Sequence, residues 1–598
     1  MRWCIEAGLP GLGVDLAPYT SLCEQTLGTT HPDTLTSRNN LAYAYQDAGK
    51  LDQAIPLFEQ NLTDQEQILG PHHPHTLTSR GNLATAYQEA GNLNKAIPLF
   101  QQNLTDTEQA LGPRHPDTLA SRNNLAAAYK DAGNLDQAIA LFEQNLTDRE
   151  RILGPHHPHT LTSRGNLATA YRLAGNLDQA IALFEQNLTD RERILGPRHP
   201  HTLTSRGNLA TAYQDAGNLN KAITLHEQNL TDREQALGPH HPHTLTSRNN
   251  LATAYQEAGN LDQAIALFQQ NLTDQEQILG PHHPDTLISR NNLATAYQEA
   301  GNLDQAITLY EQNLTDRERI LGPHHPHTLT SRGNLATAYQ EAGNLNKAIP
   351  LHEQTLTDRE RILGPHHPHT LASRNNLATA YRDAGDLDQA IPLFEQTLTD
   401  REQILGPRHP DTLASRNNLA TAYRDAGDLD QAIPLFEQNL TDREQILGPR
   451  HPDTLASRNN LATAYKDAGN LDQAITLHEQ NLTDQEQILG PRHPHTLASR
   501  NNLATAYKDA GNLGQAITLH EQNLTDREQV LGPRHLDTLA SRNNLALAYH
   551  AAGKLDQAIA LYEQALSDAV EVSGDQHPTT LGIRRNLKQA SRERDETA

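Results

Sequence analysis

A segment of 42 residues recurs along almost the whole chain, and this period constrains the fold more than any other feature. The motif His-Pro-Asp-Thr-Leu at residues 31–35 returns as a near copy at His73, then every 42 residues as far as His535, with a further start at His577. Residues 31–576 therefore contain thirteen units of 42 residues. A fixed period of this length is typical of solenoid proteins, in which each unit buries its apolar face against its neighbours.

Composition narrows the functional classes. The 598 residues carry a formal net charge of −24 at pH 7, whereas nucleic-acid binding ordinarily needs a basic surface, so we expect no nucleic-acid partner. No stretch approaches the roughly 20 consecutive apolar residues of a membrane-spanning helix, so we expect no membrane partner. Only Cys4 and Cys23 are cysteines, and Met1–Thr20 is a poor signal peptide. The predicted location is therefore cytoplasmic.

Each unit predicts two helices. In the first unit, the apolar residues between Pro32 and Gly49 share one helical face: Leu35, Leu41, Ala42, Tyr45 and Ala48. A second apolar run ends at Gly70 and contains Leu51, Ala54, Ile55, Phe58, Leu62 and Leu69. These patterns predict a helix of roughly 16 residues, a short turn and a helix of roughly 18. Asn134, followed three residues later by Gln137, predicts a capping box at the start of the second helix.

These residues resemble the tetratricopeptide repeat (TPR) pattern. Leu41-Ala42-x-x-Tyr45, Ala54-x-x-x-Phe58 and Pro74 match its L-G/A-x2-Y, A-x3-F and closing P. The 42-residue version, with Leu-Gly-x-x-His-Pro and Asn-Asn-Leu-Ala, is similar to the repeats of kinesin light chains and of bacterial TPR arrays, some of which form the sensor end of STAND-class signalling ATPases. The resemblance implies an all-α fold, a right-handed α-solenoid of thirteen helix-turn-helix units. HEAT-like repeats are the alternative, against which the Ala-x-x-x-Phe pattern argues.

The two ends of the chain differ from the thirteen units at 31–576. Residues 1–30 are interpreted as a degenerate N-terminal half-repeat or a truncated upstream segment, because residues 24–28 match 66–70. Residues 577–598 are interpreted as a C-terminal capping half-repeat with a polar tail. In that half-repeat, Lys588 and Ser591 replace the apolar residues that would contact a further unit.

The first helices vary mainly on one face. In the first unit the variable positions are Thr36, Asn39, Tyr43, Gln46 and Asp47, whose spacing places them together. In TPR arrays the first helices line the concave surface, so the resemblance places this face in the groove. Two interpretations remain: a solvated face on which drift is harmless, or a graded groove that binds an extended or helical peptide.

The candidate partner-binding residues are amides and cations on this face. An amide both donates and accepts, which suits a peptide backbone, and glycine replaces it at Gly81, Gly165, Gly207 and Gly333, leaving room for a ligand side chain. The cations suit acidic residues of a partner or, alternatively, pair with neighbouring carboxylates such as Asp383 and Asp425. The candidates are Asn39, Gln46, Asn123, Lys130, Arg172, Asn249, Asn291, Asn375, Arg382, Asn417, Arg424, Asn459, Lys466, Asn501 and Lys508.

An arginine and an asparagine recur in every unit. The stem of Arg38 should follow the apolar stripe while its guanidinium reaches a carboxylate such as Asp64 or Glu66, or their equivalents in an adjacent unit. We interpret the pair as a structural ladder between units; the alternative is a clamp for the carboxylate of a peptide terminus. The first ladder residues are Arg38, Asn40, Arg80, Asn82, Arg122 and Asn124.

Catalytic motifs are missing from the sequence. It contains no Walker loop, no Gly-x-Ser-x-Gly and no His-Glu-x-x-His, and the glycine-rich residues 8–13 lack the lysine of a phosphate loop. We therefore expect no enzyme activity, no catalytic residue and no cofactor. The 32 histidines, clustered as in residues 70–75, suggest metal buffering as an alternative, but the ligand spacing is poor and we expect no metal site.

The predicted function is a non-enzymatic scaffold that binds a protein or peptide along the concave face. The alternative is the sensor arm of a STAND-type signalling ATPase whose nucleotide-binding module is absent from this chain.

Overall fold

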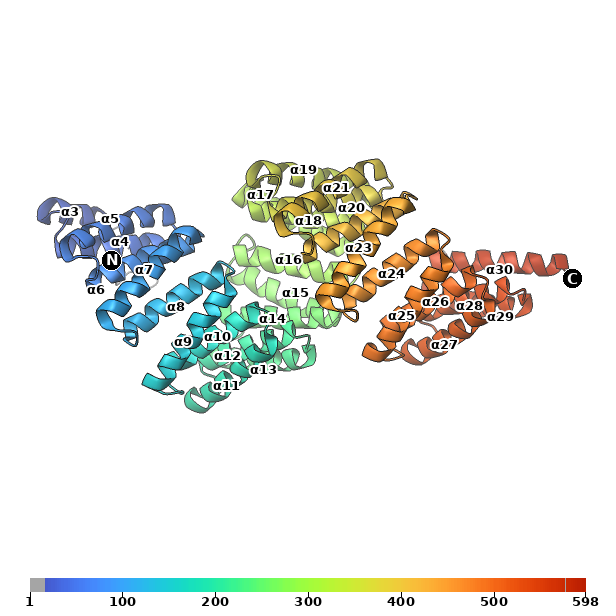
Figure 1. Ribbon diagram of the computed structural model, residues 1–598, viewed down its shortest axis with the longest axis horizontal. Coiled ribbons are helices and arrows are strands. Elements are labelled where there is room, and N and C mark those ends of the chain that lie inside the picture. Colours follow the sequence, from blue (N-terminus) through green and yellow to red (C-terminus); the bar gives the residue numbers. More distant parts are fainter. Residues whose placement is uncertain (1–16, 576, 598) are drawn as a thin grey trace. The chain divides into compact units, whose positions relative to one another are not determined.

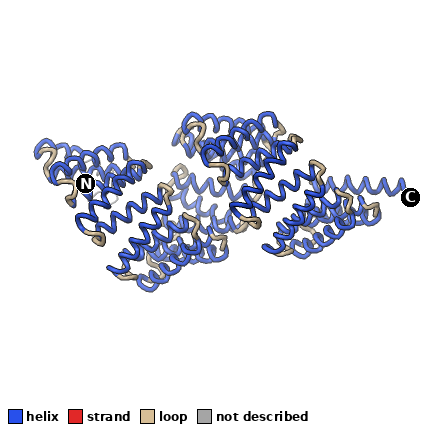
Figure 2. Tube along the Cα trace, in the orientation of Figure 1, coloured by secondary structure: helices blue, strands red, loops and turns tan. Residues whose placement is uncertain are grey.

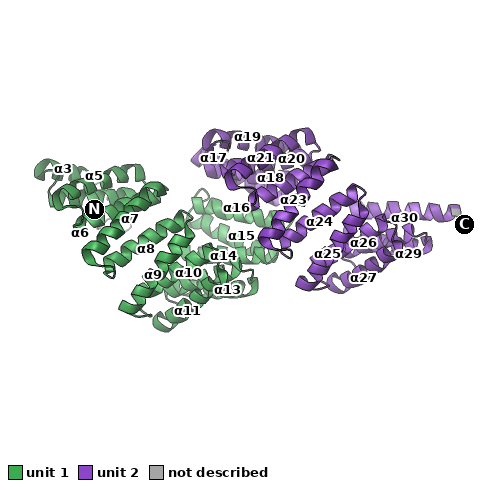
Figure 3. Cartoon of the chain, viewed as in Figure 1, with its two compact units in different colours: residues 1–302 green, residues 303–598 purple. Residues whose placement is uncertain are grey.

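The computed structural model describes residues 17–575 and 577–597, which fall into two compact units, Met1–Asn302 and Leu303–Ala598 (Figure 3). Cys4 and the glycine-rich residues 8–13 lie outside the described residues, as does much of the segment 1–30. All the regular structure in the described residues is helical, and short loops join the helices (Figure 2). The all-α prediction is confirmed.

The helices alternate in length as the sequence predicts (Figure 1). The first compact unit, which ends at Asn302, contains α3 (Ala17–Leu27), α4 (Pro32–Asp47), α5 (Leu51–Leu69), α6 (Pro74–Glu89), α7 (Leu93–Leu111), α8 (Pro116–Asp131), α9 (Leu135–Leu153), α10 (Pro158–Leu173), α11 (Leu177–Leu195), α12 (Pro200–Asp215), α13 (Leu219–Leu237), α14 (Pro242–Glu257), α15 (Leu261–Ile278) and α16 (Pro284–Glu299). The second contains α17 (Leu303–Leu321), α18 (Pro326–Glu341), α19 (Leu345–Leu363), α20 (Pro368–Asp383), α21 (Leu387–Leu405), α22 (Pro410–Asp425), α23 (Leu429–Leu447), α24 (Pro452–Asp467), α25 (Leu471–Leu489), α26 (Pro494–Asp509), α27 (Leu513–Leu531), α28 (Leu536–Ala551), α29 (Leu555–Ser573) and α30 (Pro578–Thr597). From α4 onward, even-numbered helices are the first helices of the repeats and odd-numbered helices the second.

Local chemistry defines the ends of the first helices. His31 caps α4, because its Nδ1 accepts a hydrogen bond from the Asp33 backbone N–H at 3.2 Å, and Pro32 occupies the first turn. The helix ends where Gly49 adopts a φ of 72°, which lets the Lys50 N–H reach the Tyr45 carbonyl oxygen at 2.8 Å. The histidine and the glycine recur in every repeat and the proline in all but the last, where Leu536 replaces it, so the same helix recurs.

The prediction of a capping box is wrong for the repeats that have asparagine before the second helix. The Asn134 side chain makes no capping hydrogen bond, although the residue precedes α9. Where aspartate takes this place, at Asp386 and Asp428, its carboxylate does accept from the backbone N–H three residues later, for example that of Gln389. A charged acceptor interacts more favourably with the helix N-terminus than a neutral amide does.

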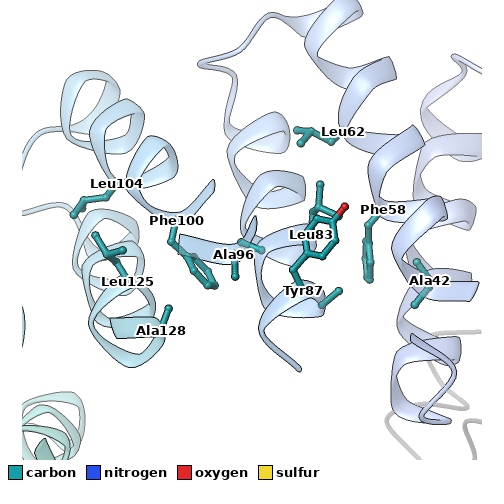
Figure 4. Packing of buried hydrophobic residues seen from close by; sticks show 13 residues of the cluster. Ala42, Phe58, Leu62, Leu83, Tyr87, Ala96, Phe100, Leu104, Leu125 and Ala128 are labelled. Atoms are coloured by element: carbon teal, nitrogen blue, oxygen red, sulfur yellow. The ribbon is translucent and has the colours of Figure 1, made fainter. Parts of the chain in front are cut away.

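The core between successive repeats is built from small and large apolar side chains. Ala42, Ala54 and Phe58 are fully buried, and Phe58 packs between the first helix of its own repeat and Leu83 of the next (Figure 4). The buried alanines let adjacent helices approach closely, while the phenylalanine fills the space between them. Each helix therefore depends on its neighbours in sequence, which is the organisation of a solenoid.

Candidate partner-binding surface

The recurring arginine joins three helices. Arg38 on α4 is 2% exposed, and its Nη1 donates to Asp64 Oδ2 on α5 at 2.6 Å while its Nη2 donates to Glu24 Oε1 on α3 at 2.8 Å. Arg80 and Arg122 make the equivalent contacts in the next two repeats. Breaking a buried, paired guanidinium contact is costly, so this clamp holds each repeat to the preceding one. Because its donors face carboxylates of the same chain, the geometry supports the structural ladder rather than a clamp for a partner's terminus.

The recurring asparagines form a second ladder, which involves the predicted binding amides. Asn82 Nδ2 donates to Asn39 Oδ1 at 3.3 Å, and Asn418 donates to Asn375 at 3.0 Å. Five further predicted amides accept in the same way: Asn123, Asn249, Asn417, Asn459 and Asn501. Asn40 on α4 lies at the position of the donor Asn82, and Asn291 on α16 lies at the position of the acceptor Asn39. The amide oxygens are thus engaged between repeats before any partner arrives.

Glycine interrupts this ladder in four repeats. Gly81 removes the acceptor that would face Asn124, and Gly165, Gly207 and Gly333 do the same in their repeats. A Cβ atom at Gly81 would lie 3.4 Å from Asn103 Nδ2, and at Gly165 it would lie 3.3 Å from Asn187 Nδ2. At Gly333 a Cβ would meet nothing within 4 Å. The space beside three of these glycines is therefore bordered by a buried asparagine of the second helix.

The predicted binding cations also contact neighbouring side chains. Arg172 pairs with Asp215 of the next repeat at 2.6 Å, and Arg382 and Arg424 pair with the adjacent Asp383 and Asp425 at 3.0 and 3.1 Å. Lys130 and Lys508 pair with adjacent aspartates at 3.2 and 3.3 Å, and Gln46 donates to Glu89 at 2.8 Å. Lys466 lies at the same position of α24. The contacts support the alternative in which these residues pair with neighbouring carboxylates.

Sequence reasoning missed an arginine on the second helix that reaches the next repeat. Arg443 on α23 donates from Nη1 to the Asp453 carbonyl oxygen and to Ser457 Oγ, both at 2.9 Å and both on α24. Burial lowers the pKa of its guanidinium. We call a junction with this arginine a filled junction. The arginines are Arg149, Arg191, Arg233, Arg317, Arg359, Arg401, Arg443 and Arg527.

Five of the thirteen repeats lack this arginine: the last repeat has Ala569 in its place, and we call the junctions of the other four open. Gln65, Thr107, Gln275 and Gln485 replace it. At the same four junctions the serine of the next repeat accepts instead from a buried asparagine: Asn61–Ser79 at 3.5 Å, Asn103–Ser121 at 3.4 Å, Asn271–Ser289 at 3.3 Å and Asn481–Ser499 at 3.4 Å. These long contacts are weak. In the sequence, the open junctions could have been recognised from the replacement of this arginine by another residue.

Cavities occur at three of the open junctions. They measure about 270 Å³ between α6, α7 and α8, about 230 Å³ between α14, α15 and α16, and about 360 Å³ between α24, α25 and α26. The largest is bordered by Leu455 and Ala456 of α24, Gln485 and Ile488 of α25, and Ser499 of α26. It therefore has aliphatic walls, with amide and hydroxyl groups among them.

A second position that sequence reasoning missed lies in the core. Phe58 is replaced in four repeats by His226, His352, His478 and His520, which are 1–2% exposed. Burial lowers the pKa of each imidazole to about 4. These histidines are therefore neutral at physiological pH. Comparison of the copies position by position reveals the exchange of phenylalanine for histidine.

Two features of the described residues bear on other partners. Among them, no group of three or more His, Cys, Asp or Glu side chains is arranged to hold a metal ion. Within the part of the chain that the structure describes, no helix is long and apolar enough to cross a membrane.

Comparison with known proteins agrees with the repeat architecture. The tetratricopeptide repeat model matches twelve overlapping segments between residues 33 and 569. A kinesin light chain-like protein of Podosopora anserina with nearly identical TPR-like repeats is 35% identical, over 35% of this chain and 98% of that one, with a TM-score of 0.33. BtubC (BKLC) from P. vanneervenii is 21% identical over 38% of this chain and 92% of its own, with a TM-score of 0.34. Among curated protein sequences, none matches this chain.

Proposed function

Because the chain belongs to the tetratricopeptide repeat family, whose arrays generally mediate protein–protein interactions, we propose that it is a scaffold that binds a protein or peptide on the face of its first helices. The observation that carries this proposal is that each repeat combines a constant structural framework with variable exposed positions. The clamp arginine is constant and buried, and its aspartate and glutamate partners are constant too, whereas the exposed positions of the first helices and the junctions beside them differ along the chain.

Variation on one face of a constant framework suits recognition of an extended partner. The described first helices present exposed small residues such as Ala456 and Ala498 beside the polar ladders, so a polypeptide can approach the backbone closely. The net charge of −24 favours a partner with basic groups and speeds their encounter. A sensor arm of a STAND-type ATPase would place the same demand on this face, because such an arm also works by binding.

Site-specific photo-crosslinking tests the proposal. A crosslinking amino acid replaces Ala456 on a first helix or, as the matched control, Gln480 on the exposed side of α25. We expect covalent adducts with a host protein from position 456 and few from position 480, with competition by the unlabelled protein. Adducts that form only from position 480 would place the binding surface on the second helices and contradict the proposal.

A further inference from the structure

The filled junctions show which chemical group fits the space between two repeats. In eight repeats a guanidinium from the second helix donates to a backbone carbonyl in the first turn of the next first helix, at distances of 2.8–3.0 Å. In five of them it also donates to a serine hydroxyl at 2.8–3.0 Å. The same molecule thus contains eight examples of an arginine bound in one environment.

The open junctions keep these acceptors but lack the arginine, and their serine accepts only a long contact from the buried asparagine. At the 360 Å³ cavity, Ser499 and His495 of α26 correspond to Ser457 and Asp453 of α24, which bind Arg443 at the preceding junction. Gln485 stands in place of the arginine. The cavity is therefore bordered by the serine and the helix turn that receive a guanidinium elsewhere.

Unpartnered acceptors also border this cavity. Asn481 and Gln485 are 1% and 9% exposed, and within the described structure Asn481 Oδ1 and Gln485 Oε1 have no hydrogen-bond donor. Asn271 and Gln275 repeat the arrangement at the 230 Å³ cavity. The equivalent Asn439 Oδ1 also lacks a donor at a filled junction, so the acceptors that only the open junctions have are Gln485 Oε1 and Gln275 Oε1. Buried carbonyl oxygens without a donor are unfavourable, so a group with several N–H donors would stabilise both sites.

The walls and the mouth of the cavity suit the rest of an arginine side chain. Leu455, Ile488 and Leu489 border it, and Ile488 remains 45% exposed. The methylene stem of arginine packs on such aliphatic surface while its head makes polar contacts. Ala456 and Ala498 are exposed and also border the cavity, so it opens on the first-helix face.

We propose that the open junctions bind arginine side chains of a partner polypeptide, which supply in trans the guanidinium that the filled junctions contain in cis. Guanidinium has five N–H donors and no acceptor, which matches amide, carbonyl and hydroxyl oxygens. Lysine fits less well, because its ammonium group is compact and more strongly hydrated. The inference rests on the proposed function and specifies the partner: a segment with arginines, attracted by the acidic chain.

Fluorescence anisotropy with defined peptides tests this proposal on the full chain. The probe is a labelled peptide of about ten residues in which arginine alternates with glycine and serine; lysine and citrulline versions are the comparisons. We expect the arginine peptide to bind at least fivefold more tightly than either comparison. In the variant Gln65→Arg/Thr107→Arg/Gln275→Arg/Gln485→Arg, the cis arginines fill the cavities and the affinity should fall at least tenfold.

A matched variant separates filling from charge. Gln60→Arg/Gln102→Arg/Gln270→Arg/Gln480→Arg adds the same four charges at exposed positions of the same second helices, and it should lose much less affinity. Circular dichroism checks that both variants fold. Equal losses in the two variants, or equal binding of arginine and lysine peptides, would show that charge alone attracts the probe and that water fills the cavities. If the crosslinks from position 456 persist in that case, only the arginine proposal fails and the proposed function stands.

Discussion

Repeats 10 and 11, residues 409–450 and 451–492, are adjacent and nearly identical, but they differ at one core position and at one position of the junction with the next repeat. The paired differences are Arg424/Lys466, Asp428/Asn470, Pro434/Thr476, Phe436/His478 and Arg443/Gln485. The first three pairs change side chains near the surface, and the helices of the two repeats have the same lengths. The last two pairs change buried or junction groups.

The comparison shows how a repetitive array carries local differences without changing its framework. Exchange of Phe436 for His478 puts a titratable group into the core, and exchange of Arg443 for Gln485 leaves a cavity of about 360 Å³ beside α26. The clamps formed by Arg416 and Arg458 are the same in both repeats. Two side chains therefore give repeat 11 a buried imidazole and a cavity bordered by a glutamine in place of the arginine.

The largest effect should come from the feature that the two repeats share. Removal of the guanidinium in Arg416→Ala or Arg458→Ala leaves Asp442 or Asp484 without its main buried partner, and we expect each variant to lose about 3–5 kcal/mol of local stability. Hydrogen exchange of the surrounding helices measures the loss. Arg424→Ala, at a surface pair in the same region, is the control and should change local stability by less than about 1 kcal/mol. Similar losses in all three variants would argue against the clamp.

The next effect distinguishes the cores of the two repeats. Burial, and to a smaller extent Lys466, lowers the pKa of His478 from 6.5 to about 4. Above pH 6.5 neither folded nor unfolded His478 is protonated. As pH falls from 6.5 to 4 the unfolded chain binds a proton that the folded one excludes, so the free energy of unfolding should fall by up to about 3 kcal/mol. His478→Phe should remove this loss.

Local hydrogen exchange in α25 at pH 7 and pH 5 measures the effect. Phe436→His is the reciprocal variant and should introduce acid sensitivity into α23. An unchanged pH dependence in His478→Phe would show that this imidazole is solvated and does not titrate with a lowered pKa.

A smaller effect should follow from filling the junction after repeat 11. Gln485→Arg adds donors for Ser499 and for the His495 carbonyl, and we expect a gain of about 1 kcal/mol in the local stability of α26. Arg443→Gln should lose a similar amount at α24, since two hydrogen bonds of 2.9 Å disappear. Urea-dependent hydrogen exchange of the two helices compares them. A loss of stability in Gln485→Arg would mean that the cavity does not accommodate a guanidinium.

The sequence predicted the helices well because their signals are local. His31, Pro32 and Gly49 set the ends of the first helix within the repeat itself, and the spacing from Leu35 to Tyr45 sets its buried face. The clamp was also within reach, since Arg38 needed only a carboxylate on a neighbouring helix, and Asp64 and Glu24 provide two.

The candidate site was predicted less well, because its contacts are between repeats. Asn39 and Arg382 have the donors and acceptors of a binding surface, but a neighbouring side chain already engages each of them. Arg443 lies in a polar stretch that suggests an exposed helix, and the contact with the next first helix partly buries it. The sequence alone therefore did not show that Gln485 stands in place of an arginine that contacts the next repeat.

The stoichiometry of arginine-peptide binding tests the central claim most directly. Isothermal titration of the full chain counts the sites for a peptide with one arginine, in the unmodified protein and in the reciprocal variants Gln485→Arg and Arg443→Gln. If open junctions bind arginine, filling one junction should remove one site, and opening one should add one. Site numbers that do not change in either variant would contradict the account.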